Sequence, residues 1–379
     1  VTLNGQSAAD AFGFSVASAG DFNGDGIDDI IVGAHLDDAP CGIACGNAFI
    51  FFGSINGTKR ADTDADVIIK GQSVNDFLGA SVASAGDFNG DGKDDVIIGA
   101  PGDDNNGSVS GSAFIFFGGI TGIKNADTDA DVIISGEAVG DNVGQSVSSA
   151  GDFNGDGKSD VIVGAPKEST NGTGCGSAYI FFGGITGTKG SNTDADVIIN
   201  GSRCSNFGYS VASAGDFNGD GKDDVIIGDH NLSDVSVITK AYIFFGGING
   251  TLNDTSADVI INGQNVGDKF GNPVSSAGDF NGDGKDDVII GARLDDNNSL
   301  TSSGSAFIFF GGVSGTKTAD ADADVILNGQ SAGDQFGGSV ASAGDYNGDG
   351  KGDVIVGAHL TDSGSAFIFF GGITGNKRA

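Results

Sequence analysis

Residues 87–100 read DFNGDGKDDVIIGA, and versions of this stretch with small changes occur six times in the chain. Asp87, Asn89 and Asp91 place oxygen-bearing side chains at positions 1, 3 and 5, Gly92 stands at position 6, and Asp95 returns at position 9. Calcium takes about six to eight oxygen ligands in a loose geometry, and glycine tolerates the sharp turn that such a loop needs. The stretch is therefore predicted to be a calcium-binding loop that leads into a β-strand.

This loop differs from an EF-hand, because position 12 is Ile98 rather than a bidentate Glu and an apolar strand follows instead of a helix. A single DxNxDG motif is a weak signal of calcium binding. Six copies in register are a strong one.

The chain is organised as six repeats. Its 379 residues exceed the roughly 250 to 300 at which a single hydrophobic core usually stops growing. No linker-like change in composition separates the copies, and a fixed period of this kind predicts a repeat architecture. We expect one domain over residues 1–379, with repeats at about 7–71, 72–136, 137–201, 202–263, 264–329 and 330–379 plus 1–6.

The formal net charge of -33 comes almost wholly from Asp, because Glu137 and Glu168 are the only glutamates. Such a charge disfavours nucleic acid and anionic membranes as partners and favours divalent cations. Solubility in a salty medium is an equal alternative for the Asp outside the loops. No run of 18 apolar residues exists and Val1 does not open a signal peptide, so we expect a soluble, already processed chain.

The four cysteines are too few for a disulfide scaffold, but their even number agrees with an oxidising compartment. Cys41 and Cys45 lie in one loop. Cys175 and Cys204 lie in two different loops, which we expect on the same face of the fold. We expect Cys41–Cys45 and Cys175–Cys204 disulfides. A zinc site is disfavoured, because these cysteines come from different repeats and the chain has only three histidines.

Each repeat contains four predicted strands. In the second copy they are strand A at residues 80–85 (ASVASA), strand B at 95–100 (DVIIGA), strand C at 112–117 (SAFIFF) and strand D at 131–134 (DVII). The apolar runs are continuous rather than alternating, which indicates sheets that are covered on both faces, and we find no helical segment to cover them. The predicted fold is therefore all-β, a six-bladed β-propeller of four-stranded antiparallel blades.

The two ends of the chain suggest how the ring closes. Residues 1–6 (VTLNGQ) match the strand D sequence at 325–330 (VILNGQ), yet they precede the first strand A. The last copy stops after its strand C at residues 366–370. We expect the N-terminal strand to complete the last blade, which removes exposed sheet edges.

These features resemble the FG-GAP repeats that build the propeller of integrin α subunits and of many bacterial surface proteins. Phe-Gly stands at residues 12–13, 207–208, 270–271 and 336–337, and Gly-Ala-Pro at 99–101 and 164–166. Both signatures flank the calcium loop in the order that the family uses, and the resemblance covers essentially the entire chain.

Several positions depart from the family pattern. Leu78 and Val143 replace the Phe, and Pro273 is expected to interrupt the fifth strand A. The Pro position of Gly-Ala-Pro holds His35, His230, Arg293 and His359. The integrin propeller has more blades, of which only some carry calcium, and no inserted ligand-binding domain or leg domain is present here. Integrin signalling is therefore not implied.

The resemblance implies six Ca²⁺ sites, each with the same ligand positions. Each site would use the side chains at loop positions 1, 3, 5 and 9 and the backbone carbonyl at position 7. The implied ligands are Asp21, Asn23, Asp25, Ile27 and Asp29; Asp87, Asn89, Asp91, Lys93 and Asp95; Asp152, Asn154, Asp156, Lys158 and Asp160; Asp216, Asn218, Asp220, Lys222 and Asp224; Asp279, Asn281, Asp283, Lys285 and Asp287; and Asp345, Asn347, Asp349, Lys351 and Asp353.

Calcium in these loops has two interpretations: it staples strand A to strand B, which we favour, or it regulates adhesion. Position 8 holds Asp in four loops, but Ser159 and Gly352 replace it in the other two. The Asp at position 8 is therefore not expected to be a required ligand.

The loops between strands B and C differ in length and chemistry from copy to copy, whereas strands and metal loops repeat almost verbatim. In a propeller these loops and the D–A loops emerge on the face opposite the A–B and C–D turns. They are rich in Asp, Asn, Ser and Thr, which suits hydrogen bonding more than apolar docking. A uniform frame with varied loops is typical of a binding surface, although drift in unconstrained loops is the alternative. The varied segments are 35–46, 102–111, 167–176, 230–240, 293–304 and 359–364.

No catalytic constellation stands out. His35, His230 and His359 occupy equivalent positions after strand B, where we expect solvent-exposed loop histidines. With so many Asp residues, accidental carboxylate pairs carry little information.

We therefore expect a secreted or cell-surface, calcium-stabilised module that binds an extracellular protein or a glycan and is not an enzyme. Neighbouring copies in a surface assembly are a further candidate partner. The alternatives left open are a structural building block of a surface layer, a lectin-like polysaccharide-binding domain, and a polysaccharide-acting enzyme such as a lyase.

Overall fold

A computed structural model describes residues 1–169, 174–230, 237–296, 300–361 and 364–379. These residues form two compact units. The first comprises Val1–Asp152, Asp156–Ile199 and Asn249–Thr251, and the second comprises Phe153–Gly155, Asn200–Ile248 and Leu252–Ala379. Each unit is described by itself below.

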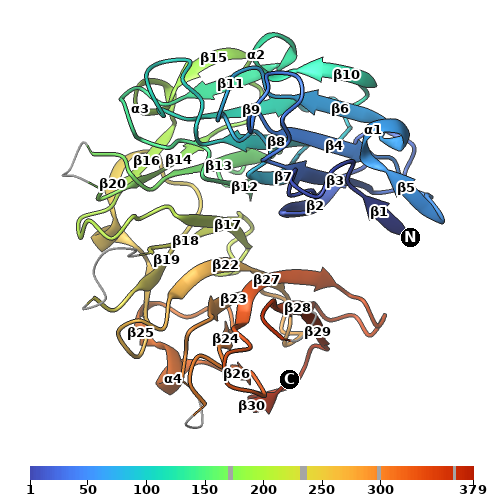
Figure 1. Cartoon of the computed structure of the whole chain (residues 1–379). Helices are drawn as coiled ribbons and strands as arrows, with labels where there is room; N and C mark the ends of the chain where they lie inside the picture. Colours follow the sequence, from blue (N-terminus) through green and yellow to red (C-terminus); the bar gives the residue numbers. More distant parts are fainter. Residues whose placement is uncertain (170–173, 231–236, 297–299, 362–363) are drawn as a thin grey trace. The chain divides into compact units, whose positions relative to one another are not determined.

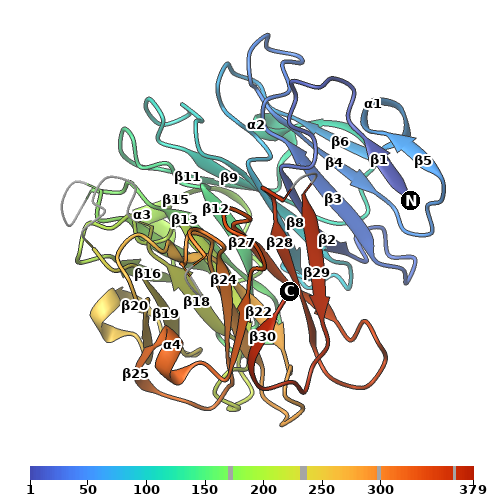
Figure 2. The same ribbon diagram turned by 60° about the horizontal axis from the view of Figure 1, so that its bottom comes forward.

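Among the described residues, five repeats fold into strands A to D and the sixth into strands A to C (Figures 1 and 2). Strand A is β2 (Ser15–Gly20), β7 (Ser81–Gly86), β12 (Ser146–Gly151), β17 (Ser210–Gly215), β22 (Phe270–Gly278) and β27 (Phe336–Gly344). Strand B is β3 (Asp29–Ala34), β8 (Asp95–Ala100), β13 (Asp160–Ala165), β18 (Asp224–Gly228), β23 (Asp287–Ala292) and β28 (Asp353–Ala358). Strand C is β4 (Asn47–Phe51), β9 (Ser112–Phe116), β14 (Ser177–Phe181), β19 (Lys240–Phe244), β24 (Ser305–Phe309) and β29 (Ser365–Phe369). Strand D is β6 (Val67–Lys70), β11 (Val132–Ser135), β16 (Val197–Asn200), β21 (Val259–Asn262) and β26 (Val325–Asn328).

The link between strands C and D is more ordered than the sequence indicates. It contains a fifth strand, which pairs in parallel with strand D of the preceding repeat, as β10 does with β6. These strands are β5 (Thr58–Arg60), β10 (Gly122–Asn125), β15 (Gly187–Gly190), β20 (Gly250–Asn253), β25 (Gly315–Thr318) and β30 (Gly375–Arg378). One helical turn follows in five repeats, although no helix is predicted from the sequence. The turns are α1 (Ala61–Asp64), α2 (Ala126–Asp129), α3 (Ser191–Asp194), the 3₁₀ turn η1 (Asp254–Ser256) and α4 (Ala319–Asp322).

The strand orders confirm the predicted fold class. The first unit contains the sheets β10-β6-β4-β3-β2 and β15-β11-β9-β8-β7, and the second contains β17-β18-β19-β21-β25, β22-β23-β24-β26-β30 and β27-β28-β29. The sheet of the third repeat has the order β12-β13-β14-β16-β20. In each sheet the repeat's own strands are antiparallel neighbours, as in β7 with β8 and β8 with β9. The chain is an all-β, six-bladed β-propeller.

The expected interruption at Pro273 is wrong, because β22 continues from Phe270 through it to Gly278. Strand A lies at the edge of its sheet, and the pairing of β22 with β23 shifts register between Phe270 and Asn272. Proline cannot donate a hydrogen bond to a ladder, but an edge position or a bulge tolerates it.

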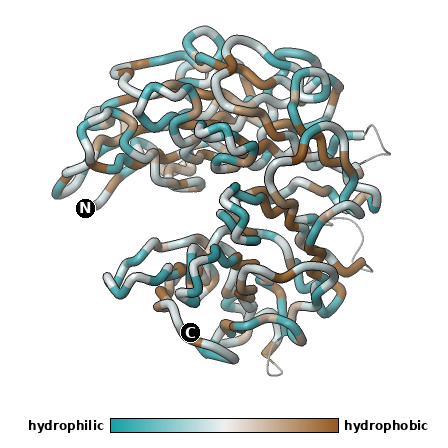
Figure 3. The backbone as a smooth tube through the Cα atoms, turned by 180° about the vertical axis from the view of Figure 1, so that it is seen from behind, coloured by the Kyte–Doolittle hydropathy of each residue, from teal (hydrophilic) through white to brown (hydrophobic). Residues whose placement is uncertain are grey.

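The core lies between the faces of consecutive blades. In the first unit, Ile50 and Ile69 of blade 1 pack with Ile98 and Phe114 of blade 2, and all four are buried. Figure 3 shows the apolar stretches as brown segments between teal turns. Burial on both faces explains why strands B and C read as continuous apolar runs, as the sequence indicates.

The N-terminal strand β1 (Thr2–Asn4) takes the place of a strand D before blade 1. It pairs in parallel with β5, and Leu3 packs against the cluster of Phe49 and Phe51 on blade 1. Other side chains on blade 1 are uncovered. Val16 is 64% exposed and Ile30 is 39% exposed, whereas the equivalent Val82 and Val96 of blade 2 are 5% and 0% exposed.

The sixth blade is also incomplete. Its described sheet holds β27, β28 and β29 but no strand D. Ile368 on β29 is 39% exposed, although the equivalent Ile308 of the fifth blade is fully buried. Completion of this blade by the N-terminal strand stays a prediction.

Deleting residues 1–6 should lower the melting temperature by roughly 5 °C and produce oligomers, because it uncovers β5 and leaves the edge of β29 available to other chains. Thermal melts and light scattering after size exclusion would measure both effects. Removal of Val1 alone is the control, since Val1 lies outside β1. A truncated chain that stays monomeric with an unchanged melt would contradict ring closure by this strand.

Candidate functional site

The six A–B loops share one hydrogen-bonded frame. In the second loop Asp87 Oδ1 accepts the backbone N–H groups of Gly90 (2.8 Å) and Asp91 (2.9 Å), and Oδ2 accepts that of Gly92 (2.9 Å). The bond from the N–H of position 5 to the carboxylate of position 1 recurs in all six loops. Gly92 has φ of 89°, in the left-handed region that favours glycine. The tight loop predicted from the sequence is confirmed.

The Asp at position 9 joins this loop to the C–D turn of the same blade. Asp95 is fully buried; its Oδ2 accepts the N–H of Asn89 at 3.1 Å and its Oδ1 accepts the N–H of Gly118 at 2.8 Å. Burial raises the pKa of Asp95 to about 7, although both hydrogen bonds lower it, and the nearby Asp91 and Asp87 raise it further. The pKa values of Asp224 and Asp287 rise to about 7 for the same reasons. Each loop thus concentrates negative charge around a buried carboxylate.

The donor set fits calcium. In the first loop Asn23 Oδ1, at position 3, is buried without a hydrogen-bond partner, so it is an acceptor that a cation would satisfy. Within the described residues, no group of three or more His, Cys, Asp or Glu side chains is arranged to hold a metal by itself. A site would therefore depend on the Asn oxygen and the position 7 carbonyl as well as the carboxylates. The six ligand sets stay a prediction.

Position 8 has a role that the sequence does not reveal. Asp94 Oδ2 accepts the backbone N–H of Asp21, the first residue of the preceding repeat's loop, at 2.8 Å. Asp286 Oδ2 accepts the N–H of Asp216 at 2.9 Å in the same way. These bonds connect consecutive metal loops. The Asp-Asp pair at positions 8 and 9 is the signal that could have indicated two separate roles.

At the other end of the blades, hydrogen bonds join the B–C and D–A loops, which the sequence analysis expects on one face. In the first unit Leu78 N–H donates to Cys45 O at 3.0 Å, and Gly102 N–H donates to Asp76 O at 3.1 Å. The D–A loop of blade 1 therefore connects the B–C loops of blades 1 and 2. Residues 170–173, 231–236, 297–299 and 362–363, which belong to four of the six varied loops, lie outside the described residues.

These loops expose more apolar surface than their Asp-, Asn- and Ser-rich sequences suggest. Ile43 is 60% exposed and Val74 is 47% exposed, and the hydrogen bond from Asn75 N–H to Ile43 O (3.1 Å) holds their loops together. Beside them is a pocket of about 360 Å³, lined by Val74, Phe77, Val109 and several polar side chains. The expectation that these loops suit hydrogen bonding more than apolar docking is therefore incomplete.

The cysteines are oxidised. Cys41 and Cys45 form a disulfide, as predicted. Cys175 and Cys204 are also disulfide-bonded, and no cysteine is free in the described residues. The pairing of Cys175 with Cys204 stays a prediction.

The expectation of three exposed histidines is wrong for His230, which is 1% exposed. Its ring lies 4.6 Å from that of Tyr209, and burial, with the charges of Lys269 and Arg293, lowers its pKa to about 4. His35 is half-buried against Phe14, with ring centroids 4.1 Å apart. Only His359 is exposed. His35 packs against Phe14 and His230 against Tyr209, which explains why these two histidines are less exposed than expected.

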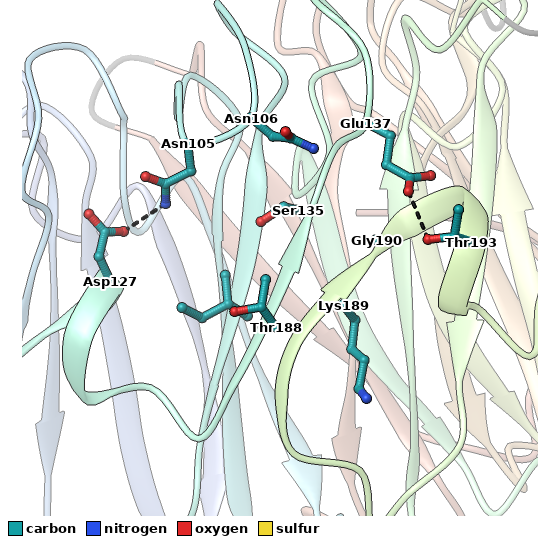
Figure 4. A pocket seen from close by; sticks show the side chains of 10 residues that line it. Asn105, Asn106, Asp127, Ser135, Glu137, Thr188, Lys189, Gly190 and Thr193 are labelled. Carbon is teal, nitrogen blue, oxygen red and sulfur yellow. Dashed lines mark hydrogen bonds between the residues drawn. The ribbon is translucent and has the colours of Figure 1, made fainter.

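A second cavity, of about 490 Å³, opens at the outer edge of blade 2 (Figure 4). Ser135 and Glu137, at the end of β11, lie between Asn105 and Asp127 on one side and Thr193 on the other. Asn105 Nδ2 donates to Asp127 Oδ1 at 3.0 Å, and Thr193 Oγ1 donates to Glu137 Oε1 at 2.7 Å. The sequence analysis did not identify this cavity, because its walls come from two repeats.

Comparison with protein families identifies the repeats. The family model described as FG-GAP repeat matches six segments, which together make up more than half of the chain. The matched residues are 12–47, 78–115, 143–181, 207–238, 271–309 and 336–369. Every segment contains the metal loop and the strand B that follows it.

Curated relatives include integrin alpha chains and a phospholipase D. The chain is 31% identical to integrin alpha-5 of Xenopus laevis over 224 residues (56% of this chain, 19% of that protein). It is 30% identical to integrin alpha pat-2 of Caenorhabditis elegans over 249 residues (60% and 18%). It is 29% identical to phosphatidylinositol-glycan-specific phospholipase D of Dictyostelium discoideum over 293 residues (71% and 30%). The chain thus spans less than a third of these relatives.

The helices among the described residues are single turns, and none is long and apolar enough to cross a membrane.

Asp103, under the B–C loop of blade 2, should make stability depend on pH. It is buried, and its Oδ2 has no hydrogen-bond partner. Burial raises its pKa from 3.8 to about 6; a hydrogen bond from Ser112 lowers it, and Asp76 and Asp127 raise it. The folded state therefore favours the protonated form, so stability is lost as pH rises from about 4 through 6.

Asp103→Asn should raise the free energy of unfolding at pH 8 by on the order of 1 to 3 kcal/mol, because it removes the buried charge. At about pH 2, where the carboxyl is protonated in both the folded and the unfolded state, the variant and the parent should melt together. Denaturant unfolding at the two pH values would measure the difference. A variant that is less stable at pH 8 would show that the charge is compensated.

Proposed function

This chain belongs to the FG-GAP repeat family, and from that premise we propose that it is a secreted or cell-surface binding and adhesion module, stabilised by calcium, that acts without catalysis. Its partner would be an extracellular protein or glycan, bound through the B–C and D–A loops. The integrin relatives support adhesion, but the chain covers only part of their length, so their activities are not transferred whole.

The observation that carries this proposal is the exposed apolar surface on otherwise polar loops. Ile43 and Val74 come from two loops that are joined by a backbone hydrogen bond, and both side chains are about half exposed. Protein interfaces are commonly built from an apolar centre with a polar rim. The surrounding Asp and Asn side chains would supply that rim, which favours a protein partner with cationic edges.

The non-enzymatic part of the proposal rests on the state of the histidines. His230 is buried and neutral at physiological pH, and its Nδ1 has no hydrogen-bond partner. His230 therefore lacks the hydrogen-bond partner at Nδ1 that would orient it for general acid–base catalysis. Because relatives include a phospholipase D, an enzymatic role elsewhere in a longer protein is compatible with this module.

Calcium would hold the end opposite the binding loops. Asp87, Asn89, Asp91 and Asp95 with the Lys93 carbonyl, and their counterparts in the other five loops, would bind it. Bound calcium supplies positive charge to the carboxylates around the buried Asp95. Because Asp95 also contacts the C–D turn through Gly118, neutralising it would stabilise both turns of a blade.

Chelation with EDTA should lower the melting temperature strongly. A site that binds a hundredfold more tightly than the ambient calcium concentration contributes about 2.7 kcal/mol of stability. Calorimetry would show the loss, and added calcium should restore the melt. Magnesium at the same concentration should restore less, because it demands a smaller octahedral site. An EDTA melt that equals the calcium melt would refute the stapling role.

Replacing Ile43 and Val74 together by Ser should weaken partner binding at least roughly tenfold, because it removes the apolar centre of the loop surface. Arrays of extracellular-matrix proteins and glycans, probed with calcium present, would first identify a partner. Ile123→Ser is the matched control, since Ile123 is 61% exposed and belongs to β10 rather than to either loop. Calcium content and the melt should stay unchanged in both variants.

A parent chain that binds nothing on these arrays, or a double variant that binds like the control, would contradict the adhesion proposal. Self-association of the parent chain in place of partner binding would then favour the structural building block of a surface layer.

A further inference from the structure

The outer edge of blade 2 differs from the same place in the other repeats. The cavity shown in Figure 4 is lined by residues of strand D (β11) and of the parallel fifth strand (β15) that the next repeat contributes. Three residues in and around it break the repeat pattern: Ser135, Glu137 and Gly190. Together they open the cavity and place a carboxylate in it.

Ser135 opens the space. The equivalent residue elsewhere is Asn4, Lys70, Asn200, Asn262 or Asn328. In the fourth blade Asn262 Nδ2 donates to Lys317 O on the paired fifth strand at 3.0 Å. Serine is too short to make this bond. The equivalent place in blade 1, where Lys70 stands, holds a smaller cavity of about 170 Å³, so the short side chain of Ser135 leaves more space here.

Gly190 allows the carboxylate to enter. A Cβ atom at residue 190 would lie 2.3 Å from Glu137 Oε1, whereas the other repeats carry Asn, Thr or Arg here. With glycine, Glu137 Oε2 accepts the backbone N–H of Asn192 at 2.9 Å and Oε1 accepts the Thr193 hydroxyl at 2.7 Å. These bonds fix the carboxylate on the cavity wall. Four of the other copies, including residues 1–6, carry Gln in place of this Glu.

The facing wall carries amides and a second carboxylate. Asn105 Nδ2 bonds to Asp127 Oδ1 at 3.0 Å, and Asn106 Nδ2 bonds to Gly136 O at 3.0 Å. An amide nitrogen has two hydrogens, so each of these can donate a second bond. Ile133 and Thr188, paired on neighbouring strands, supply an apolar floor.

We propose that this cavity binds a neutral saccharide. A sugar hydroxyl both donates and accepts hydrogen bonds, so it can donate to the Glu137 or Asp127 carboxylate while it accepts from an Asn amide. The C–H face of a sugar ring suits the Ile133 floor. The volume of about 490 Å³ lies within the range of roughly 300 to 1,000 Å³ usual for ligand pockets.

The charges around the cavity favour neutral sugars over anionic ones. Two carboxylates line the cavity, and Lys189 points away from Glu137 in Figure 4. Sulfated sugars and uronates would be repelled by these walls and by the net charge of -33. A bare metal cation suits the site less, because amide N–H groups occupy much of the wall. This site goes beyond the proposed adhesion surface, which uses Ile43 and Val74; neither residue lines it.

The intact chain would be titrated in the presence of calcium with five neutral disaccharides: cellobiose, maltose, mannobiose, lactose and N,N'-diacetylchitobiose. A sulfated heparin disaccharide would be titrated in the same way. Calorimetry and saturation-transfer NMR would measure binding. Ser135→Asn should fill part of the cavity with a longer side chain, and Glu137→Gln should remove the charged acceptor. Both substitutions restore residues that other repeats carry at these positions, so the fold should persist. Each should weaken binding of a neutral disaccharide at least roughly tenfold.

Ile43→Ser with Val74→Ser is the matched control and should leave disaccharide binding unchanged. Binding that survives Ser135→Asn, or binding of the heparin disaccharide alone, would overturn the proposal. So would the absence of binding by every neutral disaccharide. Loss of array binding in the Ile43 and Val74 variant with intact disaccharide binding would separate this site from the adhesion surface. Array binding by a parent chain that binds no disaccharide would overturn the saccharide proposal and leave the adhesion proposal standing.

Discussion

One buried carboxylate per repeat holds the metal-loop end of each blade together. Asp95 accepts hydrogen bonds from its own loop at Asn89 and from the C–D turn at Gly118, so a single side chain fixes two of the four connections of its blade. The cost is a buried charge beside two further carboxylates, which raises its pKa. Asp94 beside it bonds instead to the loop of the preceding repeat. The Asp-Asp pairs at 94–95 and 286–287 therefore tie their loops both within the blade and to the preceding loop.

The fifth strand makes the repeats interdependent. Each C–D link pairs in parallel with strand D of the preceding repeat, as β15 does with β11, so the outer edge of that sheet is covered. A repeat therefore cannot form its outer edge alone. It also means that a cavity on that edge is built by two repeats, as Glu137 and Gly190 show. Substitutions in one repeat can open a site whose other wall belongs to the next.

The rigid end leaves the opposite end free to vary. The B–C and D–A loops are joined by backbone hydrogen bonds, such as Leu78 N–H to Cys45 O, which do not depend on the side chains. Side chains such as Ile43 and Val74 can therefore change without loss of the loop frame. This separation of frame from surface suits a recognition module, because stability and specificity reside in different residues.

The sequence by itself determined the repeat, the strands, the fold class and the Cys41–Cys45 bond. These follow from local patterns: apolar runs, glycine at turns, and a loop motif in register, as in residues 87–100. The tertiary structure alone decided what depends on distant neighbours. The parallel pairing of β10 with β6, the burial of His230 and the strand continuing through Pro273 belong to this class. The cavity at Ser135 belongs to it as well, because its size depends on whether a side chain reaches across to another repeat. No local pattern records that distance.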